Sequence, residues 1–240
     1  GKKRAEKALA ELSVLALGGT AVGTGIGMHP EFSSRVITRL GELTELNLSE
    51  STNHFQAQST LDAVVSASGE LKSVAVGMLK ISNDLRWLGS GPRAGIGEIT
   101  LPEVQPGSSI MPGKVNPVIA ESVAMVSAQV IGNDTTITIA GQSGNFELNV
   151  MMPVAAHNIL ESIELLATSA KNLARQCING LTATDKGPEM VMEGLAICTA
   201  LAPIIGYDAA AAIAHEASQN GETIKEVALR VSDLTSDQLD

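Results

Sequence analysis

Residues 55–88 contain no proline, and their apolar side chains recur three and four positions apart. That spacing places the apolar side chains on one face of an α-helix. At about 1.5 Å per residue, a helix over this range would be roughly 45–50 Å long. Similar spacing predicts two further long helices, over 117–140 and 148–177. Three long aliphatic helices joined by loops are typical of a helical bundle.

The helix expected over 117–140 has an unusual surface. Its sequence "VAMVSAQVIGNDTTITIAG" is apolar or small and polar nearly all round. A helix of this kind is buried on several sides. In a chain of 240 residues, this favours neighbouring subunits that complete the core over a thick monomeric bundle.

The remaining helices are expected to be shorter. Aromatic residues make up only 2% of the chain, which argues against a β-sandwich and for an aliphatic helical core. The segment "GEITLPEV", 97–104, is expected to form a short hairpin arm. The predicted fold is therefore all-α, with a long-helix bundle over 1–180 and a small, incomplete helical subdomain over 181–240. The shorter helices are predicted over 1–17, 30–45, 184–194, 194–205, 208–219 and 222–231.

Charge and cysteine content restrict the partners. A formal net charge of -10 disfavours nucleic acid and anionic membranes as partners. No apolar run is long enough to span a bilayer, and the basic start of the chain does not resemble a signal peptide. Cys177 and Cys198 indicate a reducing compartment or simple core residues. A small anionic substrate remains compatible with this composition, because a local site can be positive.

Both ends of the chain suggest a longer polypeptide. The first residues read as the interior of a helix, and the last follow a capping-box start, Thr235 to Gln238. We therefore expect the chain to be part of a larger protein.

The loop expected at 105–116 carries the most distinctive chemistry, in the stretch "PGSSIMPGKVNP" at 106–117. A phosphate loop requires G-x-x-x-x-G-K-[ST], and here the glycine spacing is one residue too long and Val115 replaces the hydroxyl. The S-x-x-K signature of a serine hydrolase is absent, because Lys114 follows Ser108 by six residues, and this disfavours such an enzyme. No histidine or cysteine cluster indicates a metal site.

Two interpretations of the loop remain. In the first, Gly107 and Gly113 let backbone N–H groups point inward, while Lys114 and the following helix N-terminus attract a carboxylate. In the second, the loop is purely structural and Asn116–Pro117 caps the helix. Physical reasoning alone gives the two equal weight.

A family resemblance separates them. "GSSIMPGKVNP" resembles the signature of the fumarase/aspartase superfamily, G-S-x-x-M-x-x-K-x-N, at all of its fixed positions. The resemblance to class II fumarases extends over essentially the whole chain. Argininosuccinate lyases differ at the positions of Gly113 and Val115, and aspartases differ at Gly113 and around 145–147. The other matching segments are "LALGGTAVGTG", "NDLRWLGSGPRAGIGEI", "VIGNDTTI", "GNFELNV" and "IGYDAAAAIA".

This resemblance implies a lyase that hydrates fumarate to (S)-malate reversibly, through an aci-carboxylate carbanion, in the tricarboxylic acid cycle. It implies no metal and no cofactor. Ser108 would be the base, Lys114 would bind and stabilise the dicarboxylate, and Glu121 would support a histidine that handles the leaving water. The residues implied to bind the substrate are Ser109, Lys114, Val115 and Asn116.

The chain departs from the family in one respect. The family's "HTSDAMP"-like segment, which bears the histidine, and its "SSxMPxN"-like segment do not occur here. The resemblance implies a homotetramer with shared active sites, so this chain alone is not expected to catalyse. The alternatives are an aspartate ammonia-lyase and a non-catalytic assembly fragment. The implied location is the cytoplasm, or the mitochondrial matrix in a eukaryote.

Overall fold

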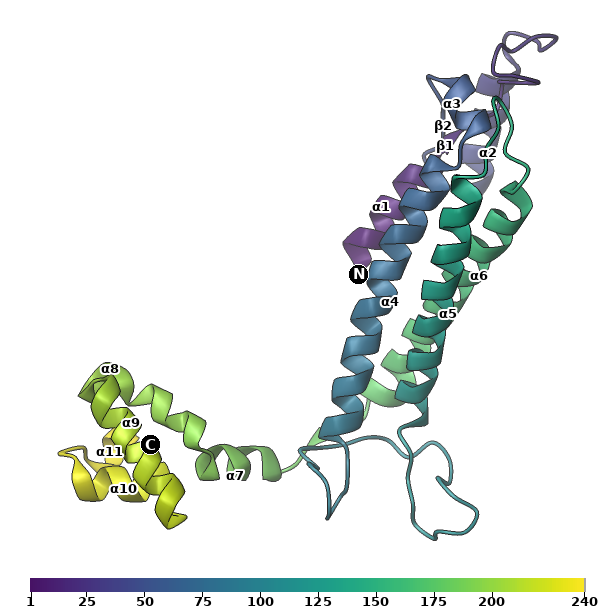
Figure 1. The fold of residues 1–240 in the computed structure, drawn as a ribbon. Coiled ribbons are helices and arrows are strands. Elements are labelled where there is room, and N and C mark those ends of the chain that lie inside the picture. Colours follow the sequence, from purple (N-terminus) through teal and green to yellow (C-terminus); the bar gives the residue numbers. More distant parts are fainter. Residues whose placement is uncertain (240) are drawn as a thin grey trace. The chain divides into compact units, whose positions relative to one another are not determined.

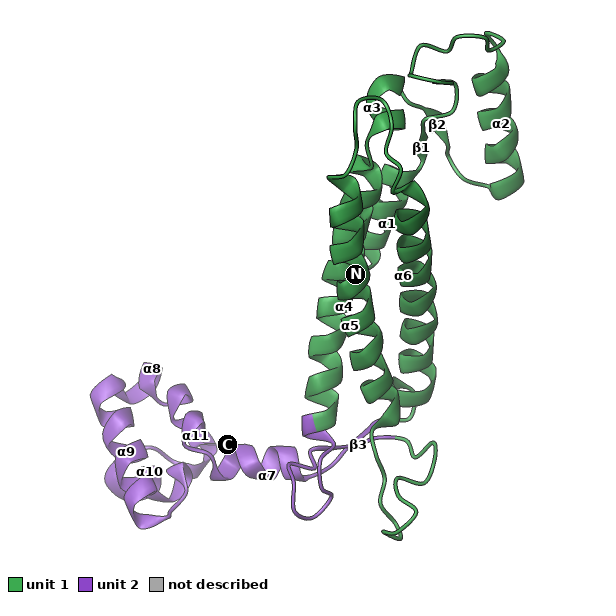
Figure 2. Ribbon diagram, turned by 45° about the vertical axis from the view of Figure 1, so that its right-hand side comes forward, with its two compact units in different colours: residues 1–86, 102–180 green, residues 87–101, 181–240 purple. Residues whose placement is uncertain are grey.

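The computed structural model describes residues 1–239 and confirms an all-α fold. The chain divides into two compact units. Unit 1 contains residues 1–86 and 102–180, and unit 2 contains 87–101 and the residues from 181 onward (Figure 2). The division into a bundle domain over 1–180 and a small subdomain over 181–240 stays a prediction.

Unit 1 is a bundle of long helices (Figure 1). Its main helices are α1 (Lys2–Leu12), α4 (Asp62–Leu88), α5 (Val118–Gly141) and α6 (Met152–Leu173). Alanines at buried positions let the helices approach closely, while larger aliphatic side chains fill the space between them. The core of the bundle consists of Ala8, Ala67, Leu71, Ala75, Val130, Ile137, Ile159 and Leu166.

The predicted continuous helix over 55–88 is wrong, because the chain breaks before α4. A short helix, α3 (His54–Ser59), comes first, and Thr60 is extended at φ -113° and ψ 169°. The Asn53 side chain caps α3 by accepting a hydrogen bond from the Gln56 N–H. The Gln56 side-chain amide then donates to the Asp62 carboxylate across the break, at 2.8 Å. The break therefore forms without proline or glycine, with a side-chain cap on α3 and a polar contact from α3 to α4.

Several other boundaries also differ from the prediction. α1 stops at Leu12, after which β1 (Val14–Leu15) pairs in parallel with β2 (Ser49–Glu50). α2 (Phe32–Thr44) begins two residues after Pro30, with Glu31 as its N-cap. α6 begins later than expected, at Met152, and continues into a π-helical segment, η1 (Ala174–Ile178).

Unit 2 contains short helices, as predicted, and a small two-stranded sheet. β3 (Ile99–Thr100), within the predicted hairpin arm, pairs antiparallel with β4 (Thr182–Ala183). Among the described residues no single helix is long and apolar enough to span a bilayer. One pair of consecutive segments, Lys186–Glu193 and Leu195–Ile205, reaches that length and hydropathy only when the two are taken together, and the pair is bent by 65°. The helices are α7 (Lys186–Glu193), η2 (Leu195–Ala200), α8 (Ala202–Ile205), α9 (Tyr207–Asn220), α10 (Ile224–Val231) and α11 (Ser236–Leu239).

Asp134 on α5 is a buried acid that contacts α4. Its carboxylate accepts hydrogen bonds from the Ser68 hydroxyl, at 2.8 Å, and from the Lys72 ammonium, at 2.6 Å. The Asp134 side chain is 7% exposed, whereas that of Lys72 is 44% exposed. The carboxylate therefore joins α5 to α4 through one buried partner, the Ser68 hydroxyl, and one half-exposed partner, the Lys72 ammonium.

We expect Asp134→Ala to lower the free energy of unfolding by about 2–3 kcal/mol, because it leaves the buried Ser68 hydroxyl without an acceptor. Lys72→Ala should cost less than about 1 kcal/mol, since the ammonium is half exposed. Urea unfolding of both variants measures the difference. Equal costs would show that the ion pair, rather than the buried hydroxyl, dominates.

Arg230 on α10 bridges two acids of unit 2. Its guanidinium donates to Glu222 at 2.6 and 2.8 Å and to Glu216 at 2.6 Å. The hydrogen bond from Arg230, with a smaller contribution from the Asn220 side chain, lowers the pKa of Glu222 from its ordinary value near 4.5 to about 2. A carboxylate with a lowered pKa stabilises the fold above its ordinary pKa, and this contribution disappears as the pH falls toward 2.

We therefore expect the Glu222 carboxyl to titrate near pH 2 in the native protein. In Arg230→Ala, its midpoint should move back toward 4.5. Carbon-13 NMR of the side-chain carboxyl measures both midpoints. A midpoint near 4.5 in the unmodified protein would contradict the assigned effect of the guanidinium.

Candidate active site

The loop that precedes α5 is closed at its neck by hydrogen bonds. The Gly107 N–H donates to the Lys114 carbonyl at 2.8 Å, and the Asn116 side-chain amide donates to the Gly107 carbonyl at 2.9 Å. A Cβ atom at position 107 would lie 2.5 Å from the Lys114 carbonyl oxygen. The neck therefore needs glycine for lack of space, and it holds the backbone of both arms together.

Ser108 follows the neck directly and is half-buried. Its Oγ accepts hydrogen bonds from the N–H groups of Ile110, at 3.2 Å, and Met111, at 3.1 Å. Backbone N–H groups directed at one oxygen stabilise negative charge on it. The loop thus directs two backbone N–H donors at the Ser108 oxygen.

Ser109, Lys114 and Val115 are all exposed. Gly113 adopts φ +77°, the left-handed region that glycine enters without strain, and this turn leads into Lys114. The Lys114 N–H donates to the Met111 carbonyl at 3.3 Å. The Lys114 ammonium and the Ser109 hydroxyl form no hydrogen bond within the described residues, so both are free to meet a ligand.

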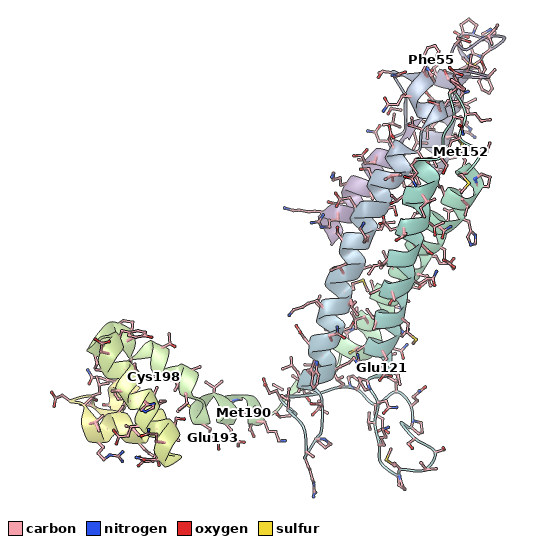
Figure 3. All side chains as sticks on the ribbon, viewed as in Figure 1. Phe55, Glu121, Met152, Met190, Glu193 and Cys198 are labelled. Carbon is pink, nitrogen blue, oxygen red and sulfur yellow. The ribbon has the colours of Figure 1, made fainter. Side chains whose placement is uncertain are left out.

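Asn116 was expected to cap the following helix, and this expectation is wrong. The N-cap of α5 is Pro117, without a side-chain cap, because the Asn116 amide turns back to Gly107. Glu121 lies in the first turn of α5, half-buried, at the base of the loop (Figure 3).

The loop is open to solvent in the isolated chain. Ile110 is 84% exposed, and Met111 and Val115 are also exposed. The hydrogen bonds described for His29, His54 and His215 all join other parts of the chain. No histidine of this chain is therefore engaged with the Ser108 turn through a hydrogen bond among the described residues.

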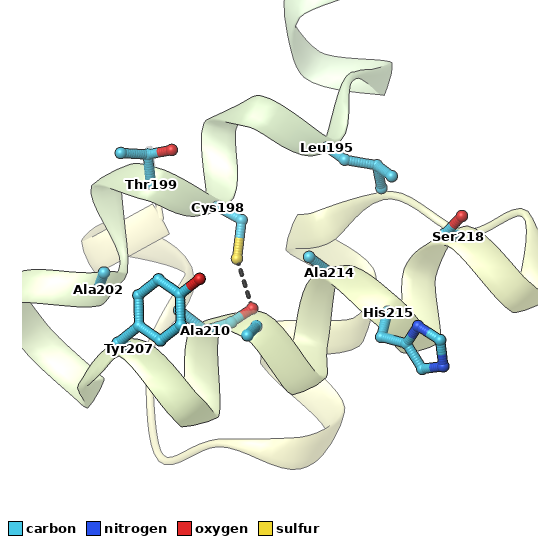
Figure 4. Close-up of a pocket in the computed structure, with 10 residues that line it drawn as sticks. Leu195, Cys198, Thr199, Ala202, Tyr207, Ala210, Ala214, His215 and Ser218 are labelled. Carbon is cyan, nitrogen blue, oxygen red and sulfur yellow. Dashed lines mark hydrogen bonds between the residues drawn. The ribbon is translucent and has the colours of Figure 1, made fainter.

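Unit 2 contains a different hollow of about 520 Å³ between η2 and α9 (Figure 4). It is mainly apolar, and its one thiol, Cys198, donates to the Ala210 carbonyl at 2.7 Å. Burial raises the pKa of Cys198, and likewise that of Cys177. Both cysteines are buried and free. Within residues 1–239 no three His, Cys, Asp or Glu side chains form a group that could hold a metal ion.

The sequence-based reasoning missed the neck of the loop. Gly107 was assigned to N–H presentation and Asn116 to capping or substrate, whereas the structure pairs them with each other. The sequence feature that could have indicated this pairing is the placement of a glycine and an asparagine just outside Ser108 and Lys114, at the two ends of a short loop. Such a signal is weak, because a side chain that bonds across a loop leaves no periodic pattern.

Comparison with known proteins gives consistent matches along the chain. A sequence model described as "Lyase" matches residues 1–132, and one described as "Fumarase C C-terminus" matches 197–240. Fumarate hydratase class II 2 of Pseudomonas aeruginosa is 51% identical over 236 residues, which cover 98% of this chain and 52% of that protein. Fumarate hydratase class II 2 of Bradyrhizobium diazoefficiens is 49% identical over 241 residues, which cover 100% of this chain and 51% of that protein.

The same likeness extends to solved structures. The crystal structure of a recombinant class II fumarase from Schistosoma mansoni superimposes with a TM-score of 0.91 at 34% identity, covering 100% of this chain and 54% of that one. The chain thus spans about half the length of the relatives that it matches.

Proposed function

This chain belongs to the lyase family of the fumarase/aspartase superfamily, and from that premise we propose that the protein is a fumarate hydratase, which interconverts fumarate and (S)-malate. The observation that carries the proposal is the Ser108 hydroxyl with two backbone N–H donors, within the superfamily's loop sequence. The class II fumarate hydratases that match the whole chain support it.

In the proposed reaction, the Ser108 alkoxide removes a proton from C3 of malate. The electron pair of the C–H bond moves into the adjacent carboxylate and forms a doubly charged aci-carboxylate. That pair then forms the C2–C3 double bond as the C2–O bond breaks, and the leaving hydroxide is protonated to water. A serine hydroxyl is normally too weak an acid for this role, so its oxygen needs nearby donors and positive charge.

Lys114 supplies that positive charge in the proposal. Its exposed ammonium would bind a substrate carboxylate and stabilise the second negative charge as it develops. Ser109, Val115 and the unused part of the Asn116 amide would complete the contacts with the dicarboxylate. Because Lys114 and Ser108 lie at opposite arms of one neck, the loop presents base and cation as one unit.

Glu121 is proposed to act through a histidine. In the family this histidine lies in the "HTSDAMP"-like segment, which does not occur among the 240 residues of this chain. In the proposal, the part of the relatives' length that this chain does not span supplies that histidine, from a neighbouring subunit. The exposed apolar side chains of the loop, such as Ile110, favour an active site covered by neighbouring subunits of a homotetramer. The tricarboxylic acid cycle and the cytoplasm, or the mitochondrial matrix of a eukaryote, are the corresponding role and location.

Two other functions remain as alternatives. An aspartate ammonia-lyase would use a similar loop, and a non-catalytic assembly protein would account for the absent histidine motif. To separate them, the intact protein is mixed with (S)-malate or with aspartate, and fumarate is followed by its ultraviolet absorbance. Fumarate from malate alone supports the proposal. Fumarate from aspartate alone identifies the ammonia-lyase, and no fumarate from either identifies the non-catalytic alternative.

A further inference from the structure

The neck of the loop uses both backbone polar groups of Gly107, its N–H and its carbonyl. Its N–H donates to the Lys114 carbonyl, and its carbonyl accepts from the Asn116 side chain. Asn116 contributes only one amide hydrogen to the neck, and its Oδ1 forms no further hydrogen bond within the described residues.

The packing at the neck leaves no space for a side chain at position 107. A Cβ atom added to Gly107 would lie 2.5 Å from the Lys114 oxygen and 2.9 Å from the Asn116 backbone nitrogen. Both neighbours are backbone atoms, so they cannot move aside without opening the loop. The φ angle of Gly107 is not in the left-handed region, and space alone therefore requires glycine here.

The two reactive side chains are attached directly to this neck. Ser108 follows Gly107 in the chain, and Lys114 provides the carbonyl that Gly107 binds. The Ser108 turn, with its donors from Ile110 and Met111, lies inside the closed segment. Opening the neck would therefore separate the serine turn from the lysine, whereas a closed neck fixes their spacing in advance of substrate binding.

We infer that Gly107 and Asn116 are positioning residues, which close the neck and hold Ser108 and Lys114 at a fixed spacing. This inference rests on the proposed function for its catalytic consequence. It assigns Asn116 a role that precedes any contact with the dicarboxylate. Such a role differs from direct substrate binding, because it is detectable in the protein without substrate.

The first test is hydrogen–deuterium exchange of residues 105–117 in the intact, substrate-free protein. In Asn116→Ala and in Gly107→Ala, amides of this segment should exchange at least about tenfold faster. Lys114→Ala is the matched control, because it removes the ammonium and keeps the carbonyl that forms the neck. Exchange in Lys114→Ala should match that of the unmodified protein. Unchanged exchange in Asn116→Ala would overturn the inference, whether or not the protein turns over malate.

The second test is kinetic and uses the same variants. Each of Asn116→Ala and Gly107→Ala should lower kcat about 10²-fold, as expected for misplaced catalytic groups. In Gly107→Ala, which removes no group proposed to contact the substrate, KM should change less than about threefold. The double variant should lose no more kcat than the more impaired of the two single variants, since both substitutions open the same neck. Losses in kcat that add in the double variant would show that the two residues act independently, and would overturn their joint role in the neck. If the protein lacks malate turnover altogether, the proposed function fails while the exchange test still decides the role of the neck.

Discussion

Replacing Ser108 with alanine is expected to lower kcat about 10³-fold, which corresponds to a barrier higher by roughly 4 kcal/mol. The substitution removes the oxygen that accepts hydrogen bonds from the N–H groups of Ile110 and Met111. In the proposal, the same oxygen takes the C3 proton. Ser108 lies in an exposed loop outside the helical core, so the fold and the assembly should be unchanged. Initial rates of fumarate formation from malate measure the loss, with circular dichroism and gel filtration as checks on structure.

The adjacent serine offers a matched control for this experiment. Ser109 has the same side chain, but its hydroxyl is exposed and forms no hydrogen bond among the described residues. Ser109→Ala should therefore reduce kcat/KM less than about tenfold, as expected for the loss of one contact to substrate. If Ser109→Ala showed the larger loss, the base would be Ser109 and the assignment of Ser108 would be wrong.

Replacing Lys114 with alanine is expected to weaken both binding and turnover. The ammonium would meet a carboxylate in the bound substrate and a greater negative charge in the aci-carboxylate, so KM should rise about tenfold and kcat should fall about 10²-fold. Lys114→Met keeps most of the length of the side chain and should behave like the alanine variant. Steady-state kinetics with malate separate the two effects. A rise in KM with unchanged kcat would limit Lys114 to ground-state binding.

Much of the bundle was predictable because its signals are periodic. The spacing of apolar residues indicated α4, α5 and α6, and the shorter helices after Gly180 followed from changes in that spacing. The break at Thr60 was not predictable from periodicity. It depends on side-chain hydrogen bonds of Asn53 and Gln56, and the apolar spacing continues across it.

The candidate site was predictable to a different degree. The resemblance located Ser108, Lys114 and Glu121 on one loop and the helix after it, and their catalytic roles remain predictions. The donors around Ser108 Oγ and the bond from Asn116 to Gly107 depend on how the loop folds back on itself. Contacts of this kind arise from backbone geometry, for which residue types at fixed spacing carry little information.

Hydration of fumarate by the intact protein in deuterium oxide is the most direct test of the proposed function. Trans addition predicts malate with one deuterium at C3, on a single face opposite to the hydroxyl group. Proton NMR of the product distinguishes this diastereomer by the coupling between the C2 and C3 protons. A single diastereomer, lost in Ser108→Ala, is the result that we expect. A mixture of both diastereomers, or no malate at all, would contradict the proposal that this loop handles the carbanion of a fumarate hydratase.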